Sequence, residues 1–319
     1  MKLLVIILNY KTATLTIDCL QSLAPQIATR PDAAAVVLEN GSADDSAAQL
    51  QAAVAVRGWS SWVELITSAT NLGFTAGNNL VIRRAMESQD PPEYFLLLNS
   101  DTVALPGAVD ALVRFMEQHP DAGIAGSRLE YPSGEIQGSP FRFHSLASEL
   151  DRSLVIGLFS RTLARSTRYD PKPSCAAPVD WVAGASMMLR RETIRAVGLL
   201  DEMFFAYFED MDYCLAAARK GWQTWYVPAS RMIHIEGASS GIRGGSRVSP
   251  PLYYFQARRR YFRKNYGLFY AAMADTALIS GCVVGLFYAI IRRRELRLSL
   301  VKLRDSLVHS VFAAGLRNV

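Results

Sequence analysis

The sequence is poor in cysteine, and the few cysteines that it has are far apart. No CxxC pair occurs among the four, which are Cys19, Cys175, Cys214 and Cys282. This spacing gives no support for a zinc knuckle or a disulfide framework, and it fits a reducing compartment. The apolar run Met1–Asn9 lacks a small-residue cleavage site, so it predicts a buried strand rather than a signal peptide. We expect a protein that stays in the cytoplasm.

An excess of basic over acidic residues is absent from most of the chain. Half of the 319 residues are apolar and 20% are charged, which excludes a mostly disordered or fibrous protein. Subtracting 29 acidic from 34 basic residues leaves +5, which favours an anionic partner such as phosphate, lipid headgroups or nucleic acid. The basic excess lies in the last quarter, in Arg258, Arg259, Arg260, Arg263, Lys264, Arg292, Arg293, Arg294, Arg297, Lys302 and Arg304. These residues alternate with apolar stretches, so we do not expect nucleic-acid binding.

Apolar runs and helical periodicities alternate along the first part of the chain. The predicted strands are Leu3–Leu8, Ala35–Leu38, Val63–Thr67 and Tyr94–Leu98, and the predicted helices are Thr12–Leu23, Asp45–Val56, Ala76–Met86 and Pro106–Glu117. This order predicts an α/β fold with a mostly parallel sheet flanked by helices on both faces. Farther along, the patterns predict a strand-like stretch Trp181–Arg190, helices Glu192–Val197 and Glu209–Lys220, a strand Thr224–Val227 and a lid loop Glu236–Pro251.

Polar side chains follow each predicted strand. They are Asn9-Tyr10, Glu39-Asn40-Gly41-Ser42, Asn71-Leu72-Gly73-Phe74 and Asn99-Ser100-Asp101. Ligands of open α/β sheets bind beyond the carboxyl ends of the strands, so these residues predict a ring of amides and carboxylates around one nucleotide. The alternative is that each cluster only forms a loop or caps a helix.

These clusters, in this order, resemble the inverting GT-A fold glycosyltransferases of family 2, and within them the rhamnosyltransferase-like group. The matching segments are Ile6–Tyr10, Glu39–Ser42, Asn71–Asn79, Leu98–Thr102, Asp201–Glu202, Phe205–Asp212 and His234. The resemblance implies a GT-A (Rossmann-like) sheet and the transfer of a sugar from a nucleotide diphosphate donor to an acceptor hydroxyl. It also implies Mg²⁺ or Mn²⁺, which would stabilise the charge of the leaving diphosphate.

The resemblance also assigns the reactive groups. Asp101 matches the metal carboxylate of the family's DxD-type motif, His234 matches the second metal ligand, and Asn99 stands where a fuller motif has another acid. Asp210 matches the base that deprotonates the acceptor, with Glu209 beside it at the start of a predicted helix. The alternatives are a turn aspartate, a buried structural histidine and helix N-terminal acids.

By the same resemblance, the residues expected at the donor are Asn9, Tyr10, Glu39, Asn40, Gly73, Asn78, Asn79, Asn99, Ser100, Gly184 and Arg259. Glu39 is one methylene longer than the family's nucleoside-binding aspartate. Gly184 matches a segment that lines the donor and acceptor cleft in the family. The stretch Gln256–Arg259 resembles the QxxRW segment of processive relatives, but Arg260 replaces the tryptophan, so processive synthesis is not expected.

The end of the chain predicts attachment to a membrane. We expect a catalytic domain over residues 1–265 and a helical, membrane-associating region over residues 266–319. The stretch Gly267–Ile291 holds one charge, Asp275, and is long enough to span about 30 Å of hydrocarbon. Basic clusters at both of its ends favour a shallow helix or a re-entrant hairpin instead. The alternative is a pair of helices that pack on the catalytic domain or form a homodimer contact.

Together these observations predict a peripheral or monotopic enzyme on the cytoplasmic face of the bacterial inner membrane. By resemblance, it transfers L-rhamnose from dTDP-rhamnose to a lipid-linked glycan during cell-envelope polysaccharide synthesis. A galactosyl, galactofuranosyl or glucosyl transfer from a UDP-sugar stays open, because the shape of the donor pocket decides the sugar. A non-catalytic polysaccharide-assembly scaffold is the alternative of another class.

Overall fold

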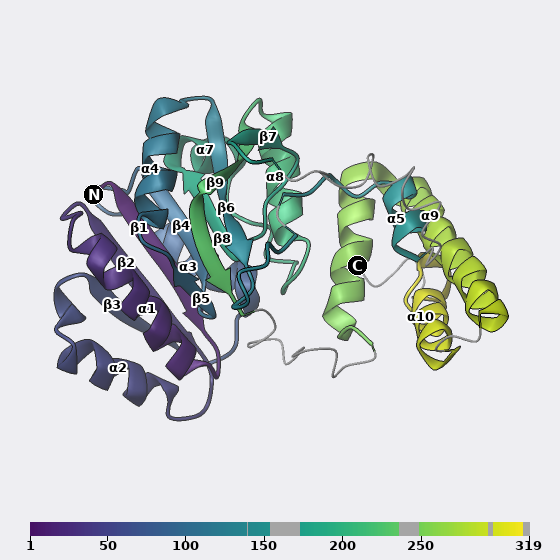
Figure 1. Ribbon diagram of the computed structural model, residues 1–319, viewed down its shortest axis with the longest axis horizontal. Coiled ribbons are helices and arrows are strands. Elements are labelled where there is room, and N and C mark those ends of the chain that lie inside the picture. Colours follow the sequence, from purple (N-terminus) through teal and green to yellow (C-terminus); the bar gives the residue numbers. More distant parts are fainter. Residues whose placement is uncertain (139, 154–172, 236–248, 293–295, 315–319) are drawn as a thin grey trace. The chain divides into compact units, whose positions relative to one another are not determined.

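The computed structural model describes residues 1–138, 140–153, 173–235, 249–292 and 296–314 (Figure 1). The chain forms two compact units, which are described separately. The first unit contains Met1–Pro140, Pro173–Phe205 and Glu209–Gly244, and the second contains Phe141–Lys172, Ala206–Phe208 and Gly245–Val319. Most of the predicted lid, residues 236–248, lies outside the described residues.

The described part of the first unit is built on one mixed sheet. Its strands are β1 (Leu3–Asn9), β2 (Ala33–Asn40), β3 (Val63–Ser68), β4 (Tyr94–Asn99), β5 (Thr102–Ala104), β6 (Ala122–Glu130), β7 (Ala177–Val179), β8 (Ser186–Arg190) and β9 (Gln223–His234). Their order is β3-β2-β1-β4-β8-β6-β9-β5, with β7 paired to β9. The longer ladders, among them β3-β2-β1-β4, are parallel, and β8 runs antiparallel to β4 and β6. The predicted α/β fold with a mostly parallel sheet is confirmed.

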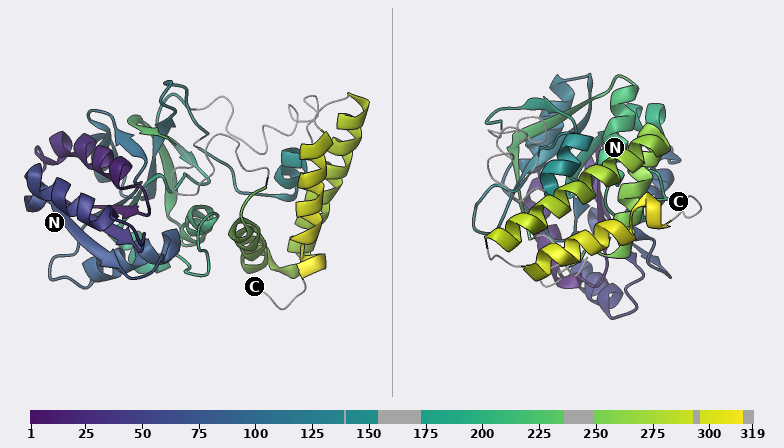
Figure 2. Two further views of the ribbon diagram at one scale, coloured as in Figure 1. Left: turned by 90° about the horizontal axis from the view of Figure 1, so that it is seen from below. Right: turned by 90° about the vertical axis from the view of Figure 1, so that its right-hand side faces the viewer.

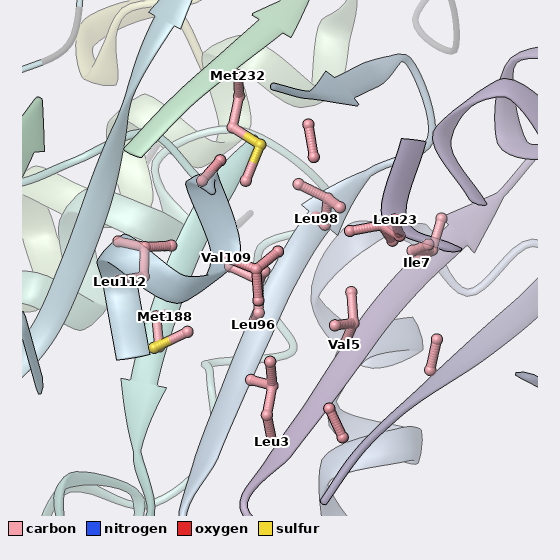
Figure 3. Close-up of a cluster of buried hydrophobic side chains, with 14 of the residues drawn as sticks. Leu3, Val5, Ile7, Leu23, Leu96, Leu98, Val109, Leu112, Met188 and Met232 are labelled. Atoms are coloured by element: carbon pink, nitrogen blue, oxygen red, sulfur yellow. The ribbon is translucent and has the colours of Figure 1, made fainter. Parts of the chain in front are cut away.

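Helices cover both faces of this sheet. The helices of the first unit are α1 (Ala13–Ile27), α2 (Ser46–Val56), the short 3-10 helix η1 (Trp59–Ser61), α3 (Gly73–Met86), α4 (Ala108–Gln118), α7 (Arg191–Val197) and α8 (Glu209–Arg219). On one face, Leu3 and Val5 of β1 are buried in the cluster that also contains Leu23 of α1 and Leu112 of α4 (Figure 3). On the other face, α3 approaches so closely that a Cβ at Gly77 would lie 3.1 Å from Leu8. Because side chains alternate along a strand, both faces of β1 are buried, as its continuous apolar run requires.

Several predicted elements differ in their bounds, and three of them matter for the site. The helix predicted from Ala76 begins at Gly73, whose backbone N–H donates to Asn71 Oδ1 at 2.8 Å. The stretch predicted as a strand from Trp181 enters β8 only at Ser186. The strand predicted to end at Val227 continues to His234, because β9 pairs first with β6 and then also with β5.

The second unit is helical where it is described. Its helices are α5 (Leu146–Ser153), α9 (Leu252–Ile291), α10 (Leu296–Val308) and α11 (Val311–Ala314). In the views of Figures 1 and 2, α10 lies along the second part of α9, and these two helices are in contact. The apolar part of α9 is the one described helix that is long and apolar enough to cross a membrane.

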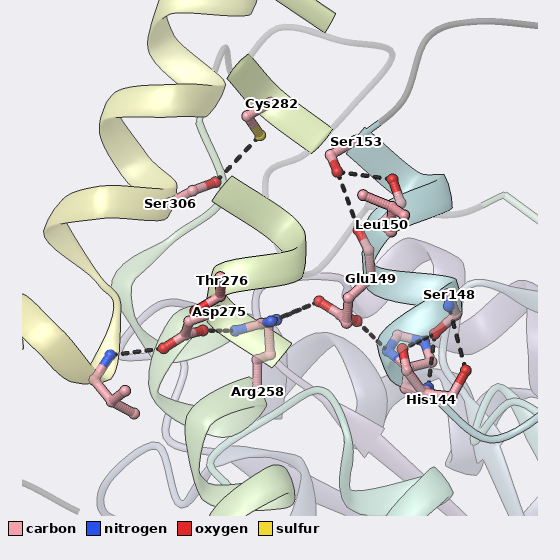
Figure 4. Close-up of polar contacts among 12 residues, drawn as sticks. His144, Ser148, Glu149, Leu150, Ser153, Arg258, Asp275, Thr276, Cys282 and Ser306 are labelled. Carbon is pink, nitrogen blue, oxygen red and sulfur yellow. Dashed lines mark hydrogen bonds and ion pairs between the residues drawn. The ribbon is translucent and has the colours of Figure 1, made fainter. Parts of the chain in front are cut away.

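Helix α9 folds back on itself at Gly267. This residue has φ 85° and ψ 170°, a conformation that glycine adopts without the strain of a side chain. A straight helix would separate Arg258 and Asp275 by about 25 Å, yet the two form an ion pair (2.5 Å between Arg258 Nη1 and Asp275 Oδ1; Figure 4). The stretch predicted from Gly267 therefore starts at a bend. The proposed division into domains at residue 265 stays a prediction.

Buried charges hold this bend. Arg258 also pairs with Glu149 of α5 at 2.6 Å, and Asp275 accepts a hydrogen bond from the backbone N–H of Val311 at 2.7 Å (Figure 4). His144 lies 3.1 Å from Glu149. These contacts connect α5, the two parts of α9, and α11. Removal of one partner of such a buried ion pair typically costs about 3–5 kcal/mol. Asp275, the one charge of the apolar stretch, is satisfied inside the protein.

Candidate active site

The carboxyl ends of β1 and β2 lie side by side. Asn9 pairs in register with Glu39, and both side chains are buried. Ser42 joins them, since its backbone N–H donates to Glu39 Oε1 at 2.8 Å and its Oγ lies 3.4 Å from Asn9 Nδ2. Three side chains of the predicted ring of polar strand ends therefore form one hydrogen-bonded group, and their contact with a nucleotide stays a prediction.

Asn40, the last residue of β2, holds the segment that follows β3. Its Oδ1 accepts the backbone N–H of Leu72 at 3.0 Å, and its Nδ2 donates to the carbonyl oxygen of Gly73 at 3.1 Å. Gly73 has φ +76°, and a Cβ on it would lie 2.5 Å from the carbonyl oxygen of Phe205. Only glycine fits this position, which brings the start of α3 against the segment that precedes α8.

Asn78 and Asn79 are buried in α3 and make internal contacts. Asn78 Nδ2 donates to the carbonyl oxygen of Phe74 at 2.8 Å. Asn79 Nδ2 donates to the carbonyl oxygen of Leu200 at 2.8 Å and to Glu202 Oε1 at 3.0 Å, and its Oδ1 accepts the backbone N–H of Leu200. The amide of Asn79 thus holds the loop after α7, and a contact of either side chain with the donor stays a prediction.

Asp101 and His234 meet although they are far apart in the sequence. Strand β5 places Thr102 opposite His234, and the backbone N–H of Ile235 donates to the carbonyl oxygen of Asp101. His234 Nε2 lies 3.4 Å from Asp101 Oδ1 and 3.4 Å from Asn99 Nδ2. The side chains of Asp101 and His234 are only 4% and 12% exposed. A carboxylate and an imidazole thus face each other with little access to water.

This donor set suits a divalent cation that is shared with a substrate. Among the described residues, no group of three or more His, Cys, Asp or Glu side chains could hold a metal ion. Asp101 and His234 supply two donors, one oxygen and one nitrogen, both of which suit Mg²⁺ or Mn²⁺. The remaining ligands would have to come from diphosphate oxygens and water.

Asp210 and Glu209 begin α8 with different surroundings. The backbone N–H groups of Gly184 and Met211 donate to Asp210 at 3.0 and 2.8 Å. Burial raises the pKa of Asp210, and these two donors oppose the rise. Burial, followed by the charge of Asp210, raises the pKa of Glu209 well above its usual value. Glu209 Oε2 has no hydrogen-bond partner among the described residues. The two backbone donors thus favour the ionised form of Asp210, whereas burial favours the neutral form of Glu209.

Residues 184–185 connect these carboxylates with the Asp101 and His234 pair. The backbone N–H of Gly184 donates to Asp210. The carbonyl oxygen of the following residue, Ala185, accepts a hydrogen bond from the backbone N–H of Asn99 at 3.0 Å. Asn99 in turn lies beside His234. These bonds explain why β8 does not begin at Trp181, because the N–H of Gly184 is directed at a carboxylate rather than at a neighbouring strand.

The strand ends join the same region through Ser100. Its Oγ lies 3.0 Å from Thr12 Oγ1, which lies 3.3 Å from Asn9 Oδ1. The structure thus brings together the predicted residues of the first unit, apart from the internally bonded Asn78 and Asn79. Arg259 differs, because it is a buried residue of α9 in the second unit. Its assignment to the donor stays a prediction.

Three residues in this region carried no signal in the sequence. Gln137 contacts both the backbone carbonyl oxygen and the ring of His234. Thr12 bridges two strand ends. Lys11 has φ 57° and its backbone N–H donates to Ser42 Oγ, while its Nζ lies 5.4 Å from the centre of the Tyr10 ring. No motif or periodicity distinguishes these residues, since only their partners in the fold reveal them.

Comparison with known proteins identifies the class of protein that this fold and site define. The chain belongs to glycosyl transferase family group 2, whose family model matches residues 94–315. It is 27% identical over 285 residues to the N-acetylglucosaminyl-diphospho-decaprenol L-rhamnosyltransferase of Mycobacterium tuberculosis, covering 85% of this chain and 90% of that protein. It is 25% identical over 164 residues to rhamnosyltransferase WbbL of Escherichia coli, covering 51% of this chain and 60% of that protein.

Solved structures confirm the GT-A fold. Mannosyltransferase PcManGT of Pyrobaculum calidifontis, solved with GDP-Man and Mn²⁺, matches with a TM-score of 0.58 at 15% identity, covering 98% of this chain and 83% of that one. GalNAc-T7, solved with UDP, GalNAc and Mn²⁺, matches with a TM-score of 0.61 at 15% identity, covering 97% of this chain and 57% of that longer one. The predicted family is therefore confirmed, and the protein is a glycosyltransferase.

Proposed function

We propose that this protein transfers L-rhamnose from dTDP-rhamnose, with inversion, to a hydroxyl of a lipid-linked glycan in cell-envelope polysaccharide synthesis. The observation that carries the proposal is the continuous chain of contacts from Asp101 and His234 through Asn99 and Gly184 to Asp210. The names of two relatives support the sugar, and the name of the mycobacterial relative supports the lipid diphosphate acceptor.

Asp210 is the proposed base. Inversion in a single displacement needs a carboxylate that takes the proton of the acceptor hydroxyl as the hydroxyl attacks the anomeric carbon. The N–H groups of Gly184 and Met211 orient the Asp210 carboxylate and stabilise its charge. A protonated Glu209 beside it avoids a second negative charge. Glu209 therefore supports the base without taking the proton itself.

Asp101 and His234 are the proposed metal ligands, and Mg²⁺ or Mn²⁺ is the proposed cofactor. Such a cation, when bound, stabilises the negative charge that develops on the departing diphosphate. Asn99 stands beside His234 where a second acid would add charge, so we expect weak affinity for the metal in the absence of a nucleotide. The predicted contribution of the chain is to hold one carboxylate oxygen and one ring nitrogen together.

The strand ends are the proposed binding site of the nucleotide. Asn9, Tyr10, Glu39 and Asn40 are assigned to the base and ribose, and Ser100 and Gly73 to the region of the diphosphate. The geometry supports this assignment because Glu39 and Asn40 are held by backbone N–H groups rather than by opposing cations. Carboxylate and amide oxygens fixed in this way accept hydrogen bonds from ribose hydroxyls or a pyrimidine N–H.

The second unit is proposed to attach the enzyme to the cytoplasmic face of the inner membrane without crossing it. Apolar side chains are exposed on its helices, at Leu268, Phe269, Phe287, Ile290, Ile291, Leu300 and Phe312. The bend at Gly267 folds α9 back on itself, so its two parts do not form one straight helix across a bilayer. The exposed apolar side chains can instead enter the interface with the helices in its plane.

A donor screen tests this function. Purified full-length protein with Mn²⁺ is heated in the presence of dTDP-rhamnose, UDP-galactose, UDP-glucose or GDP-mannose, and the melting temperature is compared with that of the nucleotide alone. We expect selective stabilisation by dTDP-rhamnose, and then transfer to N-acetylglucosaminyl-diphospho-polyprenol. Selective stabilisation by a UDP-sugar would show that this UDP-sugar, rather than dTDP-rhamnose, is the donor. Binding of a donor without transfer to any lipid-linked acceptor would favour the non-catalytic scaffold.

A further inference from the structure

His234 is held at two points by a single side chain that the proposed mechanism does not use. Gln137 is 5% exposed. Its Nε2 donates to the backbone carbonyl oxygen of His234 at 2.5 Å, and its Oε1 lies 3.0 Å from Nδ1 of the His234 ring. One amide thus holds both the backbone and the ring of the same residue.

The backbone contact fixes the orientation of the amide. A carbonyl oxygen can only accept a hydrogen bond, so the NH₂ group of Gln137 must face the carbonyl of His234. The oxygen of the amide is then the atom beside Nδ1. An amide oxygen also only accepts, so the ring hydrogen must be on Nδ1. When the ring is neutral, Nε2 consequently carries a lone pair.

That lone pair faces Asp101. A bare ring nitrogen and a carboxylate oxygen would lie 3.4 Å apart, an arrangement that is favourable when a positive charge lies between them. Asn99 Nδ2 lies 3.4 Å from the same Nε2, which agrees with a lone pair on that atom. The opposite tautomer would place a hydrogen on Nε2 and block a cation there.

The backbone around Gln137 also fixes its position. After β6, the chain turns through Tyr131–Gly134, and Glu130 bridges to Ile136. The N–H of Gln137 then donates to the carbonyl oxygen of Leu129 at 2.9 Å. This turn returns the amide to the end of β9, since β6 and β9 are paired.

We propose that Gln137 is a positioning residue that keeps His234 in the tautomer with hydrogen on Nδ1, so that Nε2 is presented as a ligand beside Asp101. The inference rests on the proposed function only in one respect, namely that the group bound by Nε2 is a divalent cation. Partners that fix the tautomer of a ligating histidine typically contribute about 10–100-fold to metal affinity. Gln137 acts through His234 and touches no substrate group in this proposal.

Nitrogen NMR of histidine-labelled full-length protein, without metal or donor and at mildly alkaline pH, tests the tautomer directly. We expect the His234 signals of the wild type to report hydrogen on Nδ1, and His234→Asn identifies them. Gln137→Leu should lose this preference, because leucine has no oxygen that accepts a hydrogen from Nδ1. A wild type with hydrogen on Nε2, or a Gln137→Leu variant with unchanged ring signals, would overturn the proposal.

Binding of Mn²⁺ in the presence of dTDP, followed by electron paramagnetic resonance, gives the second measurement. We expect Gln137→Leu to weaken binding about 10–100-fold. Gln26→Leu is the matched control, because Gln26 is also a buried, hydrogen-bonded glutamine but contacts Ala104 and Val109 of the fold. It should change the melting temperature without changing Mn²⁺ affinity. Equal losses in both variants would contradict a positioning role. If the wild type binds no Mn²⁺, the metal assignment fails, and the ring signals still decide the role of Gln137.

Discussion

At the start of α8, two neighbouring carboxyl groups share a buried position but differ in their hydrogen bonds. Asp210 accepts from two backbone N–H groups, whereas Glu209 Oε2 has no partner among the described residues. The backbone donors favour the ionised form of one acid, and burial favours the neutral form of the other. The two acids therefore differ in what their surroundings favour, although burial raises the pKa of both.

This difference predicts the effect of Asp210→Asn. We expect transfer to fall about 10²–10⁴-fold with donor affinity near that of the wild type, because the amide cannot take the proton of the acceptor. Single-turnover transfer and donor binding by calorimetry measure the two quantities. Asp212→Asn is the control, since Asp212 lies in the same turn of α8. Retained turnover in Asp210→Asn would remove it as the base.

The same group predicts the pH dependence of the wild type. Because burial raises the pKa of Asp210, the acidic limb of kcat/KM should lie above the ordinary aspartate value of about 3.9. The rate should rise with pH through that limb, as the base loses its proton. A kcat/KM that stays constant down to a pH near the pKa of a free aspartate would contradict this prediction.

Glu209→Gln should stabilise the fold above neutral pH. Its pKa is raised in the folded state, so that state holds a proton which the unfolded chain has lost, and stability falls as pH rises. Glutamine avoids this cost. The gain in melting temperature should shrink toward about pH 4, where the carboxyl of the unfolded chain is also protonated. The control is Glu202→Gln, which should destabilise the protein because Asn79 and Arg83 lower the pKa of Glu202.

At the scale of the elements, Gly73 determines how closely α3 approaches the segment before α8. Gly73→Ala combines a positive φ with a Cβ that would lie 2.5 Å from a carbonyl oxygen. We expect a loss of about 2 kcal/mol or more in the free energy of unfolding, together with weaker donor binding. Gly58→Ala is a matched control, because Gly58 has φ +69° and nothing within 4 Å. Equal losses in denaturant melts of both variants would show that the approach of Phe205 contributes nothing.

At the scale of the whole molecule, charge is divided unevenly along the chain. Residues 252–319 contain 12 basic and 3 acidic residues, a net charge of +9, so the remaining residues carry −4 of the total of +5. The basic part also carries exposed apolar side chains, including Phe269 and Phe287, which are 77% and 62% exposed. This combination is typical of a surface that binds anionic lipid.

Flotation with lipid vesicles checks this surface. We expect the full-length protein to float with phosphatidylglycerol vesicles and much less with phosphatidylcholine. A Phe269→Ser and Phe287→Ser double variant should lose most of this binding, while the exposed side chain of Val56, on α2 of the first unit, provides a control as Val56→Ser. Equal binding of both variants would contradict the assignment. A second experiment labels Lys264→Cys and Arg297→Cys with a maleimide. If the two cysteines react only from opposite sides of the membrane, the chain crosses it, which would contradict an in-plane position.

The sequence by itself determined the local elements and the residue types at their ends. The continuous apolar runs such as Leu3–Leu8 predicted buried strands, and the polar residues after them predicted the edge where Asn9 and Glu39 now lie paired. Both follow from backbone geometry, because the repeat of a strand or helix and the direction of a parallel sheet are local properties. The family motifs added the chemistry of Asp101, His234 and Asp210.

Only the tertiary structure decided which distant residues meet. The extension of β9 past Val227 places His234 beside Asp101, the turn after β6 brings Gln137 to that histidine, and the bend at Gly267 pairs Asp275 with Arg258. The family motifs predicted that Asp101 and His234 lie together, but the contacts of Gln137 and of Arg258 leave no period or motif in the sequence. Each of these contacts depends on the simultaneous packing of segments that are far apart along the chain. Such contacts are set by the burial and hydrogen bonding of the whole fold, which the local pattern of residues does not encode.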